Sequence, residues 1–323
     1  MSNIGQVRIY GCGGMGMNIA QRYADVDHKA GAAVANPVYF DTSRANVREG
    51  MNEDDVFTLE GRDGSGKKRS TNKDEIAQVI RNALHQYAPM DLNIVVFSCA
   101  GGSGSVFGPL VVKALLERGE RVVAISAGSE SSAIEAKNTI DTLKGLENLA
   151  RITERPVVTY YEHNDRKSVR SDVDRSMIFA ISSLLVLASR QNDEMDGEDL
   201  SNFLDFHKVT SVQPRLALLN IFGSGDKLNK AIRDPISIAS LYNDPDDERI
   251  DATPEYQSTG FMHGRVKDVE QLHFVVSIES VQKMSKNATD MVNKLADNHR
   301  SRVDAGSILT SKDKIDDDTG LVI

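Results

Sequence analysis

The chain has 323 residues, of which 40% are hydrophobic and 26% charged, and its formal net charge is −9. This balance is typical of a globular protein with room for two units, and no apolar run approaches the ~18 residues that a membrane span needs. The acidic balance and the absence of Trp argue against a surface that grips phosphate backbones or stacks bases, so we expect no direct contact with nucleic acid or membrane.

Short apolar runs alternate with longer helical stretches through the first two-thirds of the chain. We expect strands at 7–10, 38–40, 92–97, 121–126 and 156–161. Helices are expected between them, at 18–25, 74–87, 106–117 and 130–149. Apolar strands that alternate with helices are typical of a parallel sheet covered on both faces. The sequence therefore predicts a Rossmann-like α/β domain over residues 1–171.

The stretch from 172 to 190 is expected to form one long helix. Its centre, residues 177–188, is almost wholly apolar. A helix that is apolar on every side is expected to be buried on every side. We therefore predict a central core helix at 172–191 that runs between two packed units.

A second, smaller α/β unit is predicted over residues 192–279. Apolar runs at 215–222 and 271–278 indicate strands, and a loop rich in Asp, Pro and Tyr lies between them at 242–257. Apolar residues at helical spacing then predict an amphipathic C-terminal helix at 280–302. The remaining residues, 303–323, form an acidic tail that ends in Leu-Val-Ile.

The chain has two cysteines, Cys12 and Cys99, and each follows an apolar run and adjoins a glycine-rich segment. Two cysteines make no disulfide framework, and the N-terminus has neither the basic start nor the long apolar stretch of a secretory signal. We interpret both cysteines as small buried residues at strand ends and predict a cytoplasmic location.

Two glycine-rich loops each follow a predicted strand and open a predicted helix: residues 11–16 (GCGGMG) and residues 100–105 (AGGSGS). Glycine lets the backbone turn with positive φ and lets amides approach an anion, and a helix N-terminus adds partial positive charge. Ser103 and Ser105 add hydroxyl donors. Two such loops at one sheet edge are suited to hold a polyphosphate from both sides.

A dinucleotide-binding enzyme is the alternative at this point. Gly11, Gly13 and Gly16 satisfy the pattern G-x-G-x-x-G, and Asp41 at the end of the second strand is a candidate ribose ligand. This keeps an NAD-dependent oxidoreductase open. However, Asp41 lies well beyond the ~20 residues expected after the glycines, and a Rossmann domain has no use for a second phosphate loop.

The second loop resembles the tubulin/FtsZ signature G-G-G-T-G-[ST]-G, and residues 11–18 resemble the first loop of FtsZ. The order of elements is similar to that family from the N-terminus to about residue 200. Ala100, Ser103 and Val106 depart from the signature. The short chain, the long final helix and the acidic tail most resemble the small tubulins of large bacteriophages, of the PhuZ type.

The resemblance implies a pocket for GTP or GDP with Mg²⁺. Asn18 and Asn164 would lie on the base and ribose side, Asp174 would accept from the guanine N1 and N2 edge, and Glu130 or Glu135 would bind ribose. Residues 61–70 lie where the family senses the γ-phosphate. The implied nucleotide-binding residues are Gly13, Gly14, Met15, Asn18, Asp41, Gly101, Gly102, Ser103, Gly104, Ser105, Glu130, Glu135, Asn164 and Asp174.

The acidic segment 192–199 resembles the FtsZ loop whose carboxylates enter the next subunit's site. Asp196 and Asp199 keep the family's carboxylate spacing, and Glu194 stands in for an asparagine. The resemblance implies that Asp199, with Asp196 second, orients the attacking water. Without the resemblance, this segment is an acidic helix N-terminus that complements a helix dipole.

The resemblance implies a GTPase that polymerises head to tail, hydrolyses GTP between successive subunits and is activated by its own assembly. Its acidic tail would dock on the neighbouring subunit. The cellular role would be a dynamic filament that positions viral DNA and capsids in the cytoplasm of an infected bacterium. A nicotinamide-dependent oxidoreductase and a non-hydrolysing nucleotide-binding scaffold remain as alternatives.

Overall fold

The structure is a computed structural model of the chain. It describes residues 4–24, 29–59, 61, 73–164, 170–244, 246, 250–263 and 269–279, together with some of the residues 281–300. Most of the predicted γ-phosphate loop and the whole acidic tail, 303–323, lie outside the described residues. In the described part of the chain, no helix is both long and apolar enough to cross a membrane.

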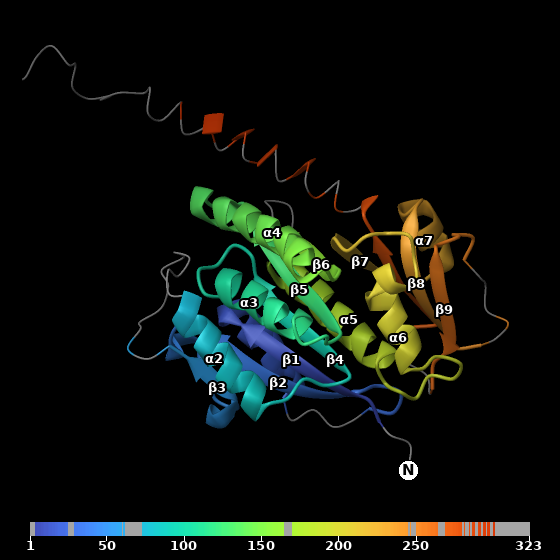
Figure 1. Cartoon of the computed structure of the whole chain (residues 1–323), viewed down its shortest axis with the longest axis horizontal. Helices are drawn as coiled ribbons and strands as arrows, with labels where there is room; N and C mark the ends of the chain where they lie inside the picture. The colour runs from blue at the N-terminus through green and yellow to red at the C-terminus, as the bar shows by residue number, and fades with distance from the viewer. Residues whose placement is uncertain are drawn as a thin grey trace, which may run out of the picture.

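One ten-stranded sheet runs through the whole molecule, in the order β3-β2-β1-β4-β5-β6-β7-β10-β8-β9 (Figure 1). The strands from β3 to β7 are all parallel, whereas β10 is antiparallel to both β7 and β8. The strands are β1 (Gln6–Cys12), β2 (Val34–Asp41), β3 (Val56–Thr58), β4 (Leu92–Ser98), β5 (Val122–Ser129), β6 (Val157–Asn164), β7 (Leu216–Phe222), β8 (Pro235–Tyr242), β9 (Tyr256–Phe261) and β10 (Gln271–Ser277).

Helices cover both faces of the parallel part of this sheet. Successive side chains of a strand point to opposite faces, so Val7 and Ile9 of β1 pack with α1 and α5, whereas Tyr10 and Cys12 pack with α2 and α3. Figure 1 shows α2, α3 and α4 side by side on the near face. The helices are α1 (Gly13–Ala20), α2 (Lys73–Gln86), α3 (Gly104–Leu116), α4 (Ala133–Thr153), α5 (Arg170–Leu187), α6 (Gly197–Leu204) and α7 (Gly225–Ala231).

Two of these helices begin inside the glycine-rich loops. The sequence placed their starts at residues 18 and 106, but α1 begins at Gly13 and α3 at Gly104. Helix α4 instead begins later than expected, at Ala133, because the Ser132 side chain caps it by accepting from the amide of Glu135. Both glycine-rich loops therefore present helix N-termini directly at the sheet edge.

The central helix α5 is buried on every side, as predicted, only over its last five residues, 183–187. Before them, Phe179 is 41% exposed and Ser182 is exposed as well. The preceding part of the helix therefore borders solvent on one side. The apolar composition alone did not distinguish these two parts.

The strands of the predicted second unit continue the sheet of the first. Strands β8 and β9 and the helix α7 were not predicted, and β8 and β9 extend the edge of the sheet beyond β10. Strand β9 (YQSTGF) is mostly polar because it is an edge strand with one exposed side. In Figure 1, α5 and α6 lie between the parallel strands on the left and β8, β9 and α7 on the right.

The predicted C-terminal helix is only partly described. The described residues between 279 and 300 have helical conformation. Met284 joins the core on the α2–α4 face, and Met291 packs against Ala136 and Ile140 of α4. This stretch therefore follows the outer surface of the parallel domain.

Candidate nucleotide-binding site

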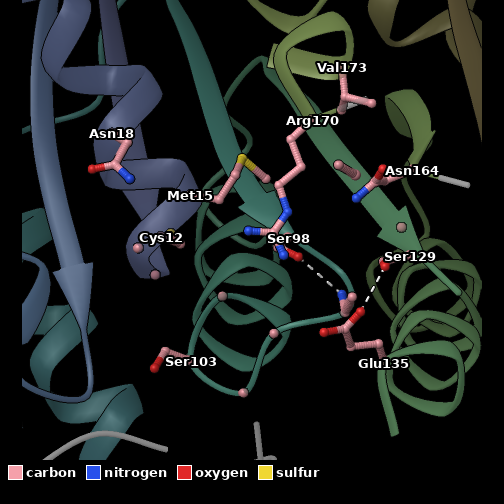
Figure 2. Close-up of a pocket in the computed structure, with 18 of the residues that line it drawn as sticks. Cys12, Met15, Asn18, Ser98, Ser103, Ser129, Glu135, Asn164, Arg170 and Val173 are labelled. Carbon is pink, nitrogen blue, oxygen red and sulfur yellow. Dashed lines mark hydrogen bonds between the residues drawn. The ribbon is translucent and has the colours of Figure 1, made fainter. Parts of the chain in front are cut away.

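A pocket of about 600 Å³ opens at the edge of the sheet where β1, β4, β5 and β6 end (Figure 2). It is built by both glycine-rich loops together with α1, α4 and α5. Its lining is Cys12, Gly13, Gly14, Met15, Asn18, Asn46, Ser98, Ala100, Gly101, Gly102, Ser103, Gly104, Ala127, Gly128, Ser129, Glu135, Asn164, Arg170, Val173 and Asp174.

The two glycine-rich loops touch each other backbone to backbone at the pocket floor. Gly13 has a φ of 70°, and a Cβ added there would lie 2.7 Å from the amide nitrogen of Gly104. A Cβ on Gly104 would lie 2.8 Å from the carbonyl oxygen of Cys12. A side chain at either position is therefore excluded, and the N-termini of α1 and α3 converge on one place. Converging amides and helix dipoles make an anion site.

A third segment, residues 41–46, closes the floor from the β2 side. Thr42 and Ser103 share a hydrogen bond of 2.7 Å between their hydroxyls. Asp41 is only 1% exposed, and its Oδ2 accepts a hydrogen bond from the side-chain Nδ2 of Asn46 at 2.7 Å. Asn46 lines the pocket, but Asp41 lies behind it. The structure thus places Asp41 as a support for Asn46 and not on the pocket surface.

The second glycine-rich loop is held from behind by α3 and α4. Ser105 is completely buried, and its hydroxyl donates to the carbonyl of Gly102 at 3.3 Å, so it braces the loop and does not line the pocket. The Asn138 amide donates to the Ala100 carbonyl at 3.1 Å. Thr142 donates to the Cys99 carbonyl at the same distance, 3.1 Å.

Of the two candidate glutamates, only Glu135 lines the pocket. Its Oε2 accepts from the Ser129 hydroxyl at 2.8 Å, as Figure 2 shows, and the residue is 7% exposed. Glu130 precedes the first turn of α4 and lies outside the lining. The sequence left open which of the two glutamates faces the pocket. The start of α4 at Ala133 decides this, because it places Glu135 in the first turn of the helix.

Polar side chains from α1, β6 and α5 also line the pocket. Asn18, Asn164 and Asp174 all line it, as the sequence predicted for one site. The Oδ1 of Asn18 is buried and has no hydrogen-bond partner within the described residues. A buried acceptor without a partner costs free energy, so a ligand that donates a hydrogen bond there fits this pocket.

Arg170 lines the pocket and was not predicted. It is the first residue of α5, and in Figure 2 its side chain extends from that helix toward Ser98. It precedes Asp174 by four residues, and residues at this spacing share one face of a helix. That spacing was the available signal, but it was useful only once the helix start was known.

Cys12 also lines the pocket, next to Gly13. Burial raises the pKa of its thiol well above the ordinary value, and the charge of Asp41 adds to this. The thiol therefore stays protonated and is a small packing group rather than a nucleophile.

The acidic segment lies at the opposite edge of the sheet, where the parallel strands begin, whereas the pocket lies where they end. Arg121, which directly precedes β5, donates to the carbonyl of Gly197 at 3.0 Å. Arg155, which precedes β6, pairs with Asp205 at 2.5 Å. Both strands end at the pocket, and the 8 residues of β5 at ~3.3 Å each separate the two edges by roughly 25 Å. Asp196 and Asp199 therefore lie far from the pocket of their own chain.

Asp196 and Asp199 form a reciprocal cap at the start of α6. The Oδ1 of Asp196 accepts from the amides of Glu198 at 2.8 Å and Asp199 at 3.1 Å. The Oδ2 of Asp199 accepts from the amide of Asp196 at 3.0 Å. These bonds satisfy orphan amides of the helix and orient both carboxylates. In the described part of the chain, no group of three or more His, Cys, Asp or Glu side chains is arranged to hold a metal.

Comparison with known proteins agrees with this geometry. The family model "Tubulin/FtsZ family, GTPase domain" matches residues 6–154, and "Phage tubulin-like protein, C-terminal domain" matches residues 195–282. A phage tubulin-like protein of Pseudomonas phage phiKZ is 30% identical over 312 residues, which cover 92% of this chain and 93% of that protein.

Two solved structures are similar over almost the whole chain. A protofilament of TubZ from bacteriophage PhiKZ has a TM-score of 0.84 and 29% identity, and the match covers 97% of this chain and 96% of that one. The phage tubulin PhuZ with GDP has a TM-score of 0.81 and 28% identity, with coverage of 98% and 99%.

The continuous sheet, the central helix and the pocket between two glycine-rich loops define a protein of the tubulin/FtsZ class, with its GTPase domain. This confirms the class that the loop motifs predicted. The chain belongs to the phage tubulin-like proteins.

Proposed function

We propose that the chain is a GTP-dependent polymerising protein whose hydrolytic site is completed between successive subunits. The observation that carries this proposal is that the pocket and the acidic segment lie at opposite edges of one sheet. One chain cannot bring them together across roughly 25 Å. Head-to-tail stacking places the acidic segment of one subunit against the pocket of the next.

The nucleotide is proposed to be a guanine nucleotide. Guanine offers two adjacent donors, N1–H and N2–H, and the Asp174 carboxylate and the Asn18 Oδ1 are acceptors in the pocket. Adenine lacks both donors at that edge, so it would leave these acceptors without partners. The phosphates would lie over Gly13 and Gly104, and Glu135 is the acidic residue for the ribose hydroxyls.

Mg²⁺ is proposed to accompany GTP. The ion typically binds substrate phosphates and keeps several waters, so a pocket whose described residues form no carboxylate cluster is compatible with it. The oxygen-bearing side chains beside the glycine-rich loops are Thr42, Ser103 and Asn46. When bound, the ion neutralises charge on the phosphates during transfer.

The chemical step is assigned to the carboxylates of the next subunit. Asp199, with Asp196 beside it, would accept a hydrogen bond from the attacking water and orient it toward the γ-phosphate. Assembly is then required for turnover. The relative solved as a protofilament and the relative solved with GDP support self-association and guanine nucleotide binding for this chain.

The cellular role is proposed from the family. A dynamic filament in the cytoplasm of an infected bacterium would position viral DNA and capsids, and the acidic tail would dock on a neighbouring subunit. Deletion of residues 312–323 should then raise the critical concentration for assembly, measured by light scattering. Unchanged assembly of the shortened chain would refute tail docking.

The alternatives make different predictions for the purified protein. GTP should cause light scattering to rise and phosphate to be released, whereas ATP and NAD should not. NAD binding without a GTP response would favour the oxidoreductase, but Asp41 is buried against Asn46 and is badly placed to contact ribose. Assembly with GTP but without phosphate release would favour the scaffold.

Mixed subunits test completion of the site in trans. We expect Asp199→Ala to bind GDP normally and to lose about 100-fold in kcat, and Asp174→Ala to lose nucleotide binding. Mixing the two variants pairs an intact pocket with an intact acidic segment, so phosphate release should exceed the sum of the separate rates. Wild-type turnover by Asp199→Ala alone would overturn the assignment.

A further inference from the structure

The carboxylate of Asp199 is held by a residue from a distant part of the chain. Tyr256, the first residue of β9, donates its hydroxyl to Asp199 Oδ1 at 3.1 Å. The other oxygen, Oδ2, accepts from the amide of Asp196. Each oxygen of this carboxylate therefore has one donor, and the two donors come from segments 60 residues apart in sequence, because Asp196 precedes α6 and Tyr256 begins β9.

The hydroxyl of Tyr256 acts as a donor over the whole physiological range. Burial raises its pKa to about 12, and the hydrogen bond to Asp199 contributes to the same shift. The proton therefore stays on the phenol, and Asp199 remains the acceptor. A charged acceptor makes such a hydrogen bond stronger than one between neutral groups.

Strand β9 also fastens the segment that leads to Asp199. Asp193 and Phe261 exchange two backbone hydrogen bonds, of 3.0 Å and 2.9 Å. A Cβ on Gly260 would lie 2.7 Å from the Asp193 carbonyl oxygen and 2.7 Å from the Cβ of Met195. Both ends of the strand thus contact the acidic segment, and the absence of a side chain at residue 260 permits the close approach.

We propose that Tyr256 is a positioning residue that orients the Asp199 carboxylate for hydrolysis in the pocket of the neighbouring subunit. This inference rests on the proposed role of Asp199 at the interface. A carboxylate that orients water must hold one geometry when the interface forms, and the amide of Asp196 fixes only one of its oxygens. The phenol fixes the second and thereby links the edge strand of the sheet to the chemistry.

The test is Tyr256→Phe in the full-length chain, assembled with GTP. This change removes one hydroxyl and leaves the ring. We expect kcat per assembled subunit to fall about tenfold, the ratio that the loss of one charge-assisted hydrogen bond gives. GDP affinity should change less than twofold, because Tyr256 lies far from the pocket of its own chain. The amount of polymer should also change less than twofold, because the lost hydroxyl donates to Asp199 of the same chain.

The matched control is Tyr87→Phe. The Tyr87 hydroxyl also donates a hydrogen bond, to the carbonyl of Asp54 at 3.1 Å, but this tyrosine follows directly after α2. We expect this variant to keep the wild-type kcat. A fall in kcat as large as that of Tyr256→Phe would overturn the inference, since any lost tyrosine hydroxyl would then suffice.

A double variant separates positioning from a general structural role. In the Asp199→Ala background, Tyr256→Phe should have no further effect on kcat, because the group that it positions is gone. An equal tenfold loss in both backgrounds would overturn the inference, and so would loss of polymer in a Tyr256→Phe variant that still folds and binds GDP. Normal turnover by Asp199→Ala would instead overturn the proposed function itself, so the two failures are distinguishable.

Gly260→Ala provides a second route should Tyr256→Phe fail to fold. The added Cβ pushes the Asp193 carbonyl away from β9 and leaves the hydrogen bonds of Asp199 chemically intact. We expect a lower kcat with unchanged GDP affinity, measured by phosphate release and by binding of a fluorescent GDP analogue. A wild-type kcat would show that β9 does not position the acidic segment.

Discussion

The two edges of the parallel sheet are built by different means. At the pocket edge the two glycine-rich loops meet backbone to backbone, with Gly13 against Gly104, and short hydroxyl and amide side chains close the floor. At the acidic edge charged side chains make the central contacts, because Asp196 and Asp199 cap α6 and Arg155 pairs with Asp205, while backbone hydrogen bonds join the segment to β9. The first edge is concave and encloses a volume, whereas the second presents carboxylates outward.

The two edges should therefore respond differently to substitution. A backbone-built cradle has no spare space, so a single methyl group disturbs both binding and packing. A side-chain-built edge tolerates changes in its exposed carboxylates but not in the buried pair beneath them.

Gly13→Ala, which adds a methyl group at Gly13, should be strongly destabilising. Its φ of 70° belongs to the left-handed region, and its Cβ would meet Gly104, so we expect a loss of about 3 kcal/mol in unfolding free energy. GDP affinity should fall more than tenfold. Gly145→Ala in α4 is the matched control because the space around its Cβ is open, and it should stabilise by about 0.5 kcal/mol. Similar effects of both changes, in denaturant titration and GDP binding, would contradict a backbone-built pocket.

Arg155→Ala should damage the acidic edge through its buried pair. The side chains of Arg155 and Asp205 are 12% and 6% exposed, and Lys208 offers Asp205 a second partner at 3.0 Å. We expect a loss of about 2 kcal/mol in unfolding free energy, because the remaining lysine offsets part of the charge left behind. Lys137→Ala breaks an exposed pair with Asp141 and should cost about 0.3 kcal/mol. Equal losses would contradict the contrast between buried and exposed charges.

Asn18→Leu should separate stability from binding. It replaces a buried acceptor that has no partner within the described residues with an apolar group of similar size, so the nucleotide-free protein should gain about 1 kcal/mol. GDP affinity should fall about tenfold, since the guanine edge loses an acceptor. The exposed Asn148 of α4 supplies the control, Asn148→Leu, which should change neither quantity appreciably. Thermal unfolding with and without GDP measures both effects, and tighter GDP binding by Asn18→Leu would refute the role of Asn18.

Glu194→Asn should have the smallest effect, and it should stabilise the protein. Glu194 has a φ of 61°, a conformation that asparagine adopts more readily than glutamate, so we expect a gain of about 0.5 kcal/mol. Glu198→Asn, at an ordinary helical position of α6, should give no gain. Chemical denaturation compares the two. A loss of stability in Glu194→Asn would show that its side chain makes a contact worth more than the strain.

The sequence was sufficient for most of the parallel strands and for the two glycine-rich loops, but the short parallel strand β3 and the part that Asn46 plays in the pocket floor were not predicted. Strand β4 carries six consecutive buried residues, and such a run marks a central parallel strand without reference to the rest of the chain. The glycines of both loops were informative for a similar reason, because a backbone that needs positive φ or close approach selects glycine locally. The second half of the sheet was harder, since β9 is a polar edge strand whose place depends on β8.

Sequence alone determined that this chain has two phosphate-type loops on a parallel sheet, because local backbone demands leave a local residue pattern. Only the tertiary structure decided that Glu135 and not Glu130 faces the pocket, that Asp41 supports Asn46 from behind, and that Tyr256 reaches Asp199. These are contacts between side chains on separate elements. They depend on where each helix begins and on how the strands are ordered, and neither leaves a periodic signal in the sequence.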